Sequence, residues 1–268
     1  MKRGTKAAAA MLAGLALSLL PIVAEGVAEA QDRGTTLELG GVSYELVPPA
    51  GLCPLELDHA SLALPVRQYF YARTAISEFD DGLGLLLWLV DCGWLREIDD
   101  MDHFRDPVFP VHMMLISVPV RPNGQLATMG STSREAYLGK IGAAYDGIPW
   151  AASDAEALAE MERLLEAMPA GDESQRPPAT FLARRAREDD VVYSADLQAY
   201  RSLPSRSDGR GETYWEISAS LSAVTVLGDF PLFLKTRDVI RDSLPADRLH
   251  AGLQSVVRQL RSQDDGRP

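Results

Sequence analysis

The sequence predicts an α+β protein in which a mostly antiparallel β-sheet is covered by helices, as an α/β/α sandwich in a single domain. Short apolar or alternating segments bounded by glycine, proline and polar residues recur along the chain, and this pattern is typical of strands. Longer stretches at 153–168 and 244–263 place apolar residues at helical spacing. Each kind of element has one apolar face to bury, which favours a layered domain.

Residues 1–30 have the pattern of a bacterial secretory signal peptide. Three basic residues among the first six precede an uncharged apolar run at 7–24. Ala28 and Ala30 supply the small residues that a signal peptidase reads, so we expect cleavage between Ala30 and Gln31. An uncleaved membrane anchor is the alternative, because this run approaches spanning length. The small residues before Gln31 favour cleavage and a periplasmic or secreted protein.

The mature chain is predicted to form one domain at 31–262, followed by a polar C-terminal tail at 263–268. Removal of the signal leaves 23 basic and 36 acidic residues, a net charge of −13. Such an acidic chain is a poor partner for nucleic acid, which is bound through lysine and arginine. No further segment is apolar enough for a stable membrane span after signal cleavage.

Several elements are expected in the first two thirds of the chain. Gly40 and Gly41 separate two short alternating segments, which predicts a β-hairpin within 35–49. Ser153 followed by Glu156 predicts a capping box at the start of a helix. The other expectations are a helix at 59–76, buried strands at 82–92 and 111–121, helices at 133–146 and 153–168, and a loop at 169–180.

The last third predicts strands followed by a helix. Strands are expected at 180–189 and 191–202, with a turn at Asp189 and Asp190 and a polar loop after them. In the strand at 213–227, Ser218, Ser220 and Ser222 occupy one face, and Ile217, Ala219 and Leu221 the other. A turn at Gly228 and Asp229 leads into a strand at 230–237 and then an amphipathic helix at 244–263.

The chain contains two cysteines, Cys53 and Cys92, and we expect them to form a disulfide. Their spacing fits neither a CxxC redox centre nor a structural zinc site. Lone cysteines usually pair in an oxidising compartment. A catalytic thiol with His59 as its base is the alternative, but a free thiol would be open to oxidation there.

Two stretches resemble a family of small secreted bacterial proteins of no assigned function. These are "VSYELVPPAGLCPLE" at 42–56 and "ISASLSAVTVLGDFPLFLKTRDV" at 217–239, the second followed by a terminal helix. The same strand–turn–strand–helix ending is similar to that of the PsbP-like fold, an α/β/α sandwich also found in a yeast Ran-binding protein. The resemblance implies an accessory or binding role and supplies no catalytic residue.

Two clusters of charged residues are candidate sites. The segment at 97–106 could hold a divalent cation, although it lacks the DxDxDG spacing of a calcium loop and a solvated acidic loop is the simpler interpretation. Its candidate ligands are Asp99, Asp100, Asp102 and His103. Three arginines could bind a carboxylate or phosphate if the strands bring them together, and pairing with nearby acids is the simpler interpretation. They are Arg184, Arg185 and Arg187.

The sequence holds none of the common catalytic motifs, such as HExxH, GxSxG, SxxK or a phosphate-binding loop. It therefore favours a non-enzymatic binding or accessory protein of the cell envelope, without a cofactor. An envelope protein or a small ligand is the expected partner. The alternative is a hydrolase without a recognisable motif, built from the acids of 97–106 and one of His59, His103 and His112. Four tryptophans are further candidates for a ligand groove, although core packing is favoured: Trp88, Trp94, Trp150 and Trp215.

Overall fold

The computed structural model describes residues 34–55, 82–99, 112–121, 123–167, 180–182, 186–188, 190–202, 214–240 and 245–266. The strands of this part are β1 (Thr35–Leu39), β2 (Val42–Leu46), β3 (Leu52–Pro54), β4 (Leu83–Asp91), β5 (Met113–Pro119), β6 (Thr180–Phe181), β7 (Ala186–Glu188), β8 (Val191–Ser202), β9 (Tyr214–Leu227) and β10 (Phe230–Val239). The helices are α3 (Cys92–Asp99), α4 (Arg134–Ala144), α5 (Asp154–Glu166) and α6 (Ala246–Asp265), with a 3-10 turn at Tyr145–Gly147.

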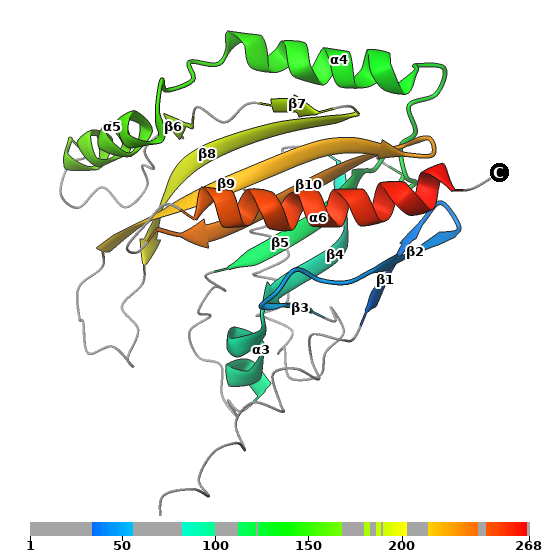
Figure 1. Ribbon diagram of the computed structural model, residues 1–268, viewed down its shortest axis with the longest axis horizontal. Helices are drawn as coiled ribbons and strands as arrows, with labels where there is room; N and C mark the ends of the chain where they lie inside the picture. Colours follow the sequence, from blue (N-terminus) through cyan, green and yellow to red (C-terminus); the bar gives the residue numbers. More distant parts are fainter. Residues whose placement is uncertain are drawn as a thin grey trace, which may run out of the picture.

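One antiparallel sheet forms the centre of the molecule (Figure 1). Its strand order is β3-β4-β5-β10-β9-β8-β6, and β7 adds to β8 beside β6. The long strands β8, β9 and β10 are joined along almost their whole length, and the turn between β9 and β10 is the two-residue Gly228–Asp229. The antiparallel α+β class expected from the sequence is confirmed.

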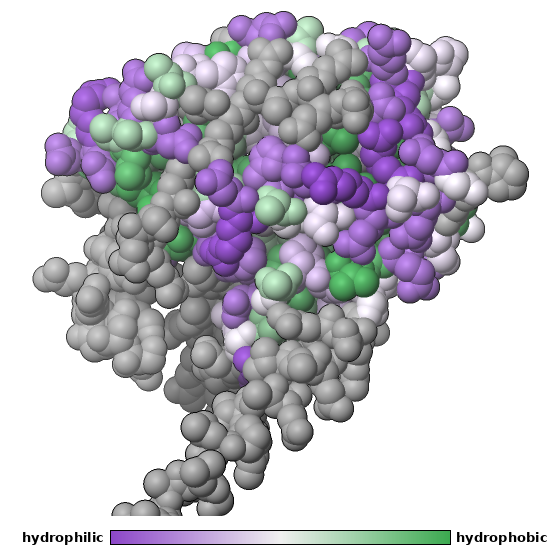
Figure 2. Space-filling model, in the orientation of Figure 1, coloured by the Kyte–Doolittle hydropathy of each residue, from purple (hydrophilic) through white to green (hydrophobic). Residues whose placement is uncertain are grey.

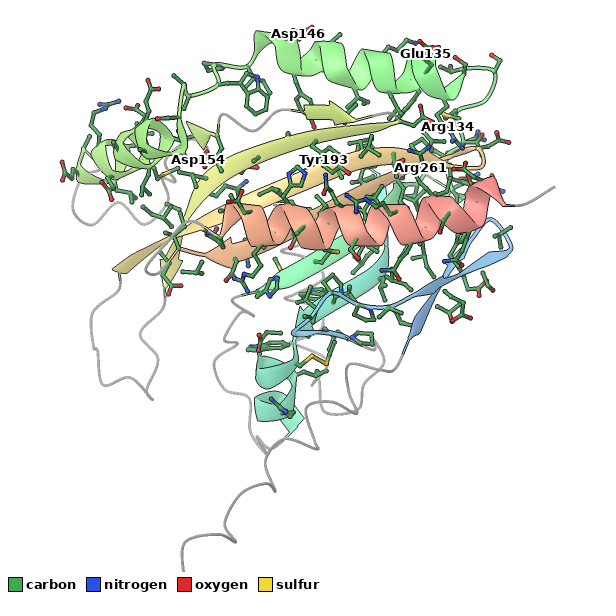
Figure 3. The ribbon with its side chains drawn as sticks, viewed as in Figure 1. Arg134, Glu135, Asp146, Asp154, Tyr193 and Arg261 are labelled. Carbon is green, nitrogen blue, oxygen red and sulfur yellow. A yellow bond between two sulfur atoms is a disulfide. The ribbon has the colours of Figure 1, made fainter. Side chains whose placement is uncertain are left out.

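Helix α6 covers one face of the sheet, which we call the α6 face (Figure 1). This face carries alternate residues of β8 and β9, such as Ala195, Leu197, Ala219 and Leu221, all of them buried. Five apolar side chains of α6 pack onto them: Leu249, Leu253, Val256, Val257 and Leu260. Tyr193 of the same face, labelled in Figure 3, stacks on the ring of His250 of α6. The two ring centroids are 5.1 Å apart.

The opposite face, which we call the α4 face, has apolar residues at its two ends. Leu138 of α4 packs on Val192, Val224 and Val226. At the β4–β5 side a separate cluster surrounds Trp94 of α3; its other buried members are Leu55, Trp88, Val90, Met113 and Leu115. The polar residues between these two clusters are described with the site below.

Strands β1 and β2 form a separate hairpin that lies beside α6 (Figure 1). Gly40 and Gly41 make its two-residue turn with φ of 61° and 82°, the left-handed region that such turns require. Two side-chain amides of α6 bind the outer edge of β2. Gln259 accepts from the N–H of Val47 and donates to its carbonyl, and Gln263 does the same for Glu45. The helix thus satisfies an edge strand without adding another strand.

Most of the expected elements are present, with shifts at their ends. The serine cap of α5 is confirmed, because Ser153 accepts from the N–H of Glu156 at 3.1 Å; the Glu156 carboxylate reaches back one residue further than in a standard capping box and accepts from the N–H of Ala152 at 2.7 Å. Helix α3 was not expected, since its residues were interpreted as the end of a strand and the start of an acidic loop. Helix α6 continues to Asp265, so residues 263–265 form its last turn. The signal peptide, the helix at 59–76 and the loop at 169–179 lie outside the described residues.

The disulfide joins Cys53 of β3 to Cys92 at the start of α3, with Cα atoms 5.0 Å apart. Cys53 lies opposite Val90 in the β3–β4 register, and the N–H of Cys92 donates to the carbonyl of Gly51 at 2.9 Å. The expected disulfide is present, and it excludes a free catalytic thiol at Cys53. A disulfide is compatible with an extracytoplasmic location. Within the described ranges, no helix is both long and apolar enough to cross a membrane.

Candidate functional site

The charged candidates from the sequence fall mostly outside the described residues. Arg184, Arg185, Asp100, Asp102 and His103 are among those outside, together with the cleavage pair Ala30 and Gln31. Arg187 belongs to β7, where its backbone lies opposite Val192, and Asp99 is the last residue of α3. Elsewhere in the described chain, no group of three or more His, Cys, Asp or Glu residues is arranged to hold a metal ion. The anion and metal interpretations of these residues remain predictions.

Two of the candidate tryptophans are core residues. Trp88 and Trp94 are 2% and 8% exposed and belong to the cluster around α3. Trp150 is half-buried; its indole N–H donates to the carbonyl of Tyr145 at 3.0 Å, and the two rings meet edge to face. Core packing is therefore the role of Trp88 and Trp94, as favoured from the sequence.

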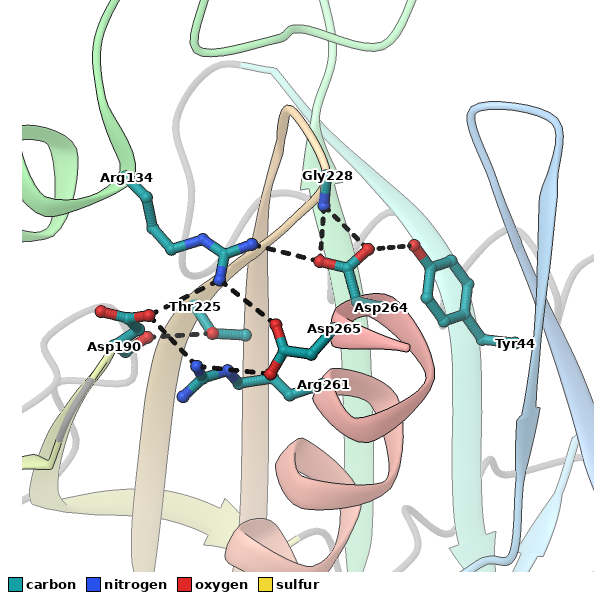
Figure 4. A network of polar contacts seen from close by, with 8 residues as sticks. All are labelled: Tyr44, Arg134, Asp190, Thr225, Gly228, Arg261, Asp264 and Asp265. Atoms are coloured by element: carbon teal, nitrogen blue, oxygen red, sulfur yellow. Dashed lines mark hydrogen bonds and ion pairs between the residues drawn. The ribbon is translucent and has the colours of Figure 1, made fainter. Parts of the chain in front are cut away.

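A network of charged side chains ties five segments together at the C-terminal end of α6 (Figure 4). Asp264 accepts from the Tyr44 hydroxyl at 2.9 Å, from the Gly228 N–H at 2.9 Å and from Arg134 at 3.1 Å. Arg261 pairs with Asp190 at 3.1 Å, and Arg134 reaches the same carboxylate at 3.5 Å. Arginine and aspartate are paired internally here, so the network is a structural clamp between the hairpin, α4, α6 and two strand turns.

Among the described residues, the surface around α6 is largely polar. Hydrophilic residues gather over α6 and the neighbouring hairpin on the side shown in Figure 2. Across all described residues, Val47 is the one large hydrophobic side chain that is exposed, at 56%. Contiguous exposed apolar area is the usual mark of a protein–protein surface. The described residues around α6 show no such area.

Polar side chains occupy the middle of the α4 face, between its two apolar clusters. Strand register places Asp196 opposite Ser220, and Ser220 opposite Arg237, so these three form one row across β8, β9 and β10. The adjacent row contains the other three in the same order of strands: Ser194, Ser222 and Lys235. Directly opposed residues have Cβ atoms about 5 Å apart, so each row is a continuous polar surface. We call these six residues the polar rows.

The polar rows are buried to an unusual degree for their chemistry. Ser220 is 0% exposed, Ser194 7% and Asp196 8%, whereas Ser222, Lys235 and Arg237 are half-buried. Within the described chain the Ser220 hydroxyl has no hydrogen-bond partner. Its neighbour Ser218, also 0% exposed, donates to the carbonyl of Gln198 at 3.4 Å. A buried hydroxyl without a partner costs about 1–3 kcal/mol of stability, so its presence calls for an explanation.

A second polar group lies at the end of the α6 face, near the start of α6. Val90 and Arg237 both lie opposite Met113, which places Asp91, His112 and Asp238 side by side one residue further along β4, β5 and β10. The N–H of Asp91 donates to the carbonyl of His112 at 3.0 Å. Asp238 is buried and forms an ion pair with Arg248 of α6. His112 is thus flanked by two carboxylates from neighbouring strands.

The protonation of His112 follows from its surroundings. Burial lowers the pKa of the imidazole below its ordinary value of 6.5. The Asp238 carboxylate opposes this shift, Arg248 adds to it, and Asp91 opposes it as the smallest contribution. The imidazole is therefore neutral at pH 7, and a neutral imidazole can accept a proton.

The sequence predicts some residues of the polar rows and of the group around His112, but not how these residues are arranged. The alternation at 217–222 placed three serines on one face of a strand, which is confirmed. It did not reveal that Asp196 and Arg237 lie beside them, because strand pairing between distant segments sets that contact. His112 was among the histidines considered for a hydrolase, but its neighbours are Asp91 and Asp238 rather than the acids of 97–106.

Comparisons with known proteins give no family. No protein-family model and no curated protein matches the chain. Similar solved structures include the Saccharomyces cerevisiae Ran-binding protein Mog1p, at 13% identity over 85% of this chain and 94% of that chain, with a TM-score of 0.33. A point mutant of Mog1 gives 14% identity with the same coverage and TM-score. These TM-scores are too low to support a conclusion about fold or function, and the resemblance to secreted bacterial proteins remains a prediction.

Proposed function

We propose that this chain is an extracytoplasmic binding or accessory protein of the cell envelope, and that the polar rows of the α4 face bind its ligand. One observation carries the proposal: a fully buried hydroxyl, that of Ser220, lies between Asp196 and Arg237 without a hydrogen-bond partner in the described chain. Its cost in folding is offset if a bound group accepts from it or donates to it. The disulfide and the pattern of residues 1–30 support the extracytoplasmic setting.

The test is native purification of the mature chain from the periplasm of the organism that makes it, followed by mass spectrometry under native and denaturing conditions. The expected result is a chain that begins at Gln31, two hydrogens lighter than its dithiol form, and carries a component that dissociates on unfolding. A bare chain, with no added mass in the native spectrum, would contradict the binding proposal. A chain that retains residues 1–30 would contradict the proposed processing.

A pair of matched variants connects the bound component to the polar rows. Ser222→Leu introduces a bulky side chain into the middle of the rows, next to Lys235. Ser43→Leu makes the same exchange on the exposed side of β2. We expect the first variant to lose the component and the second to retain it. Equal occupancy in the two variants would place the ligand elsewhere.

A hydrolase centred on His112 is the second candidate function. It is favoured by the row of Asp91, His112 and Asp238, in which a neutral imidazole lies between two carboxylates that can orient it. Such a base could activate water for attack on an ester or phosphoester. The test is turnover of chromogenic esters and phosphoesters by the wild-type chain and His112→Gln. The candidate requires a rate that rises with pH through the imidazole pKa and that the variant lacks.

A further inference from the structure

The chemistry of the polar rows goes beyond the bare proposal that they bind something. Lys235 and Arg237 are two residues apart on β10 and therefore share the α4 face. Their Cα atoms are about 7 Å apart, from a rise of about 3.4 Å per residue. Each lies directly opposite a serine of β9: Lys235 opposite Ser222, and Arg237 opposite Ser220. The four residues thus occupy the corners of a square of backbone positions on two neighbouring strands, with their side chains on the same face.

We infer that this square binds a carboxylate or phosphate group of the ligand. The guanidinium fork of arginine matches two oxygens of such a group, and the lysine ammonium adds a point charge. The Ser220 hydroxyl, which lacks a partner among the described residues, donates a further hydrogen bond to an oxygen of the bound group. The inference rests on the proposed binding function and names its ligand class.

The charge of the rows is consistent with an anion of low charge. The six residues of the polar rows include two cations, Lys235 and Arg237, and one carboxylate, Asp196, so together they carry one net positive charge. This positive region lies in a protein whose predicted mature charge is −13. Long-range attraction therefore does not bring the anion to the protein, and the selectivity comes from short-range contacts with the two cations and the hydroxyls.

Neighbouring features limit where the anion lies. Phe233 lies two residues from Lys235 on β10, and it is paired with Val224 of β9. Both side chains belong to the apolar cluster under α4. On the other side of β10, Lys235 and Arg237 lie opposite Leu115 and Met113, both of them buried and apolar. The Arg237 guanidinium approaches the sulfur of Met113 at 4.0 Å. The apolar walls lower the local dielectric, which strengthens an ion pair formed with the ligand.

The test measures anion binding by the mature, disulfide-bonded chain. Inorganic phosphate and succinate are titrated separately by calorimetry at constant ionic strength, with chloride as the control anion. Phosphate alone binding identifies a phosphate-bearing ligand, and succinate alone identifies a carboxylate; either result supports the inference. Arg237→Met is expected to weaken the effective anion at least tenfold. Arg258→Met, which removes a charge from the exposed side of α6, should leave the affinity unchanged.

Two serine variants distinguish an effect on anion binding from an effect on folding stability. Ser220→Ala removes the hydroxyl without a partner, so we expect equal or higher thermal stability without ligand, together with weaker anion binding. Ser218→Ala removes a hydroxyl that donates to Gln198, so it should lower stability and leave anion binding intact. A Ser220→Ala chain that is less stable and binds the anion as tightly as the wild type would show a structural hydroxyl and overturn the inference.

The outcomes for the inference and for the proposed function can be told apart. If neither phosphate nor succinate binds, or Arg237→Met binds as tightly as the wild type, the anion inference is wrong. If the native chain nevertheless carries a neutral or cationic component that Ser222→Leu loses, the binding function stands with a different ligand class. If the native chain is bare and both anions fail, both are wrong.

Discussion

His112 shows how a single side chain couples the fold to pH. Well above pH 6.5 the imidazole is neutral in both the folded and the unfolded chain and contributes no pH dependence. Below 6.5 the unfolded chain binds a proton that the folded chain resists, because burial lowers the folded-state pKa. The stability therefore falls as the pH decreases through 6.5 toward the folded-state pKa.

The corresponding prediction concerns the pH dependence of unfolding. The loss of stability between pH 7.5 and 5 is expected to be smaller in His112→Gln than in the wild type, because glutamine does not titrate. Urea unfolding at intervals of half a pH unit measures it, and His250→Gln is the control histidine. Parallel curves for wild type and His112→Gln would contradict the lowered pKa.

Asp264 is the residue on which the C-terminal clamp depends. It accepts from Tyr44, Gly228 and Arg134, and its side chain is 11% exposed, whereas that of Asp265 is 59% exposed. We expect Asp264→Ala to lower the free energy of unfolding by about 2 kcal/mol, because three donors, among them the hydroxyl of the buried Tyr44, lose a charged acceptor. Asp265→Ala should cost less than about 1 kcal/mol. Denaturant unfolding compares them, and equal losses would show that the clamp is not centred on Asp264.

Helix α6 makes two kinds of contact, one apolar and one through hydrogen bonds. Its apolar stripe covers the sheet, and its glutamines bind the backbone of β2 as a neighbouring strand would. The periodicity of the segment predicts the stripe, because residues three and four apart in a helix lie on the same face. It says nothing of the glutamines, whose acceptors and donors are more than two hundred residues away in the chain.

The docking of the hairpin can be measured through its backbone amides. In Gln259→Ala and Gln263→Ala chains, the N–H groups of Val47 and Glu45 lose their acceptors, so their hydrogen exchange should become faster. Gln254→Ala is the matched control, because Gln254 accepts from Arg258 on the same helix. Exchange that is unchanged at residues 45 and 47 would show that apolar packing alone holds the hairpin.

The disulfide acts on the whole chain through the unfolded state. Cys53 and Cys92 are 39 residues apart, and closing a loop of about this length is worth roughly 4 kcal/mol in the chain-entropy model. Replacing both with serine should therefore lower the melting temperature and the midpoint of denaturant unfolding by a corresponding amount. Reduction of the disulfide in the wild-type chain should lower both quantities in the same way, and it is measured in parallel. A melting temperature that does not change in either case would contradict a stabilising crosslink.

Much of the architecture could be predicted because it depends on local patterns. The hairpin at Gly40 and Gly41 needs only left-handed turn residues between alternating segments. The cap of α5 needs only Ser153 and Glu156 at the right spacing. Helix α3 was missed because its eight residues follow a strand without a break, and a capping carboxylate of the preceding residue, Asp91, begins it.

The candidate site depends on contacts that no local pattern encodes. Periodicity, charge and the two cysteines were enough for the antiparallel class, the disulfide and the polar face of β9, since each follows from spacing along the chain. The register between strands set the rest: it places Ser220 between Asp196 and Arg237, and His112 between Asp91 and Asp238. A shift of one residue in a strand pairing would turn these side chains to the other face, so folding rather than sequence spacing brings them together.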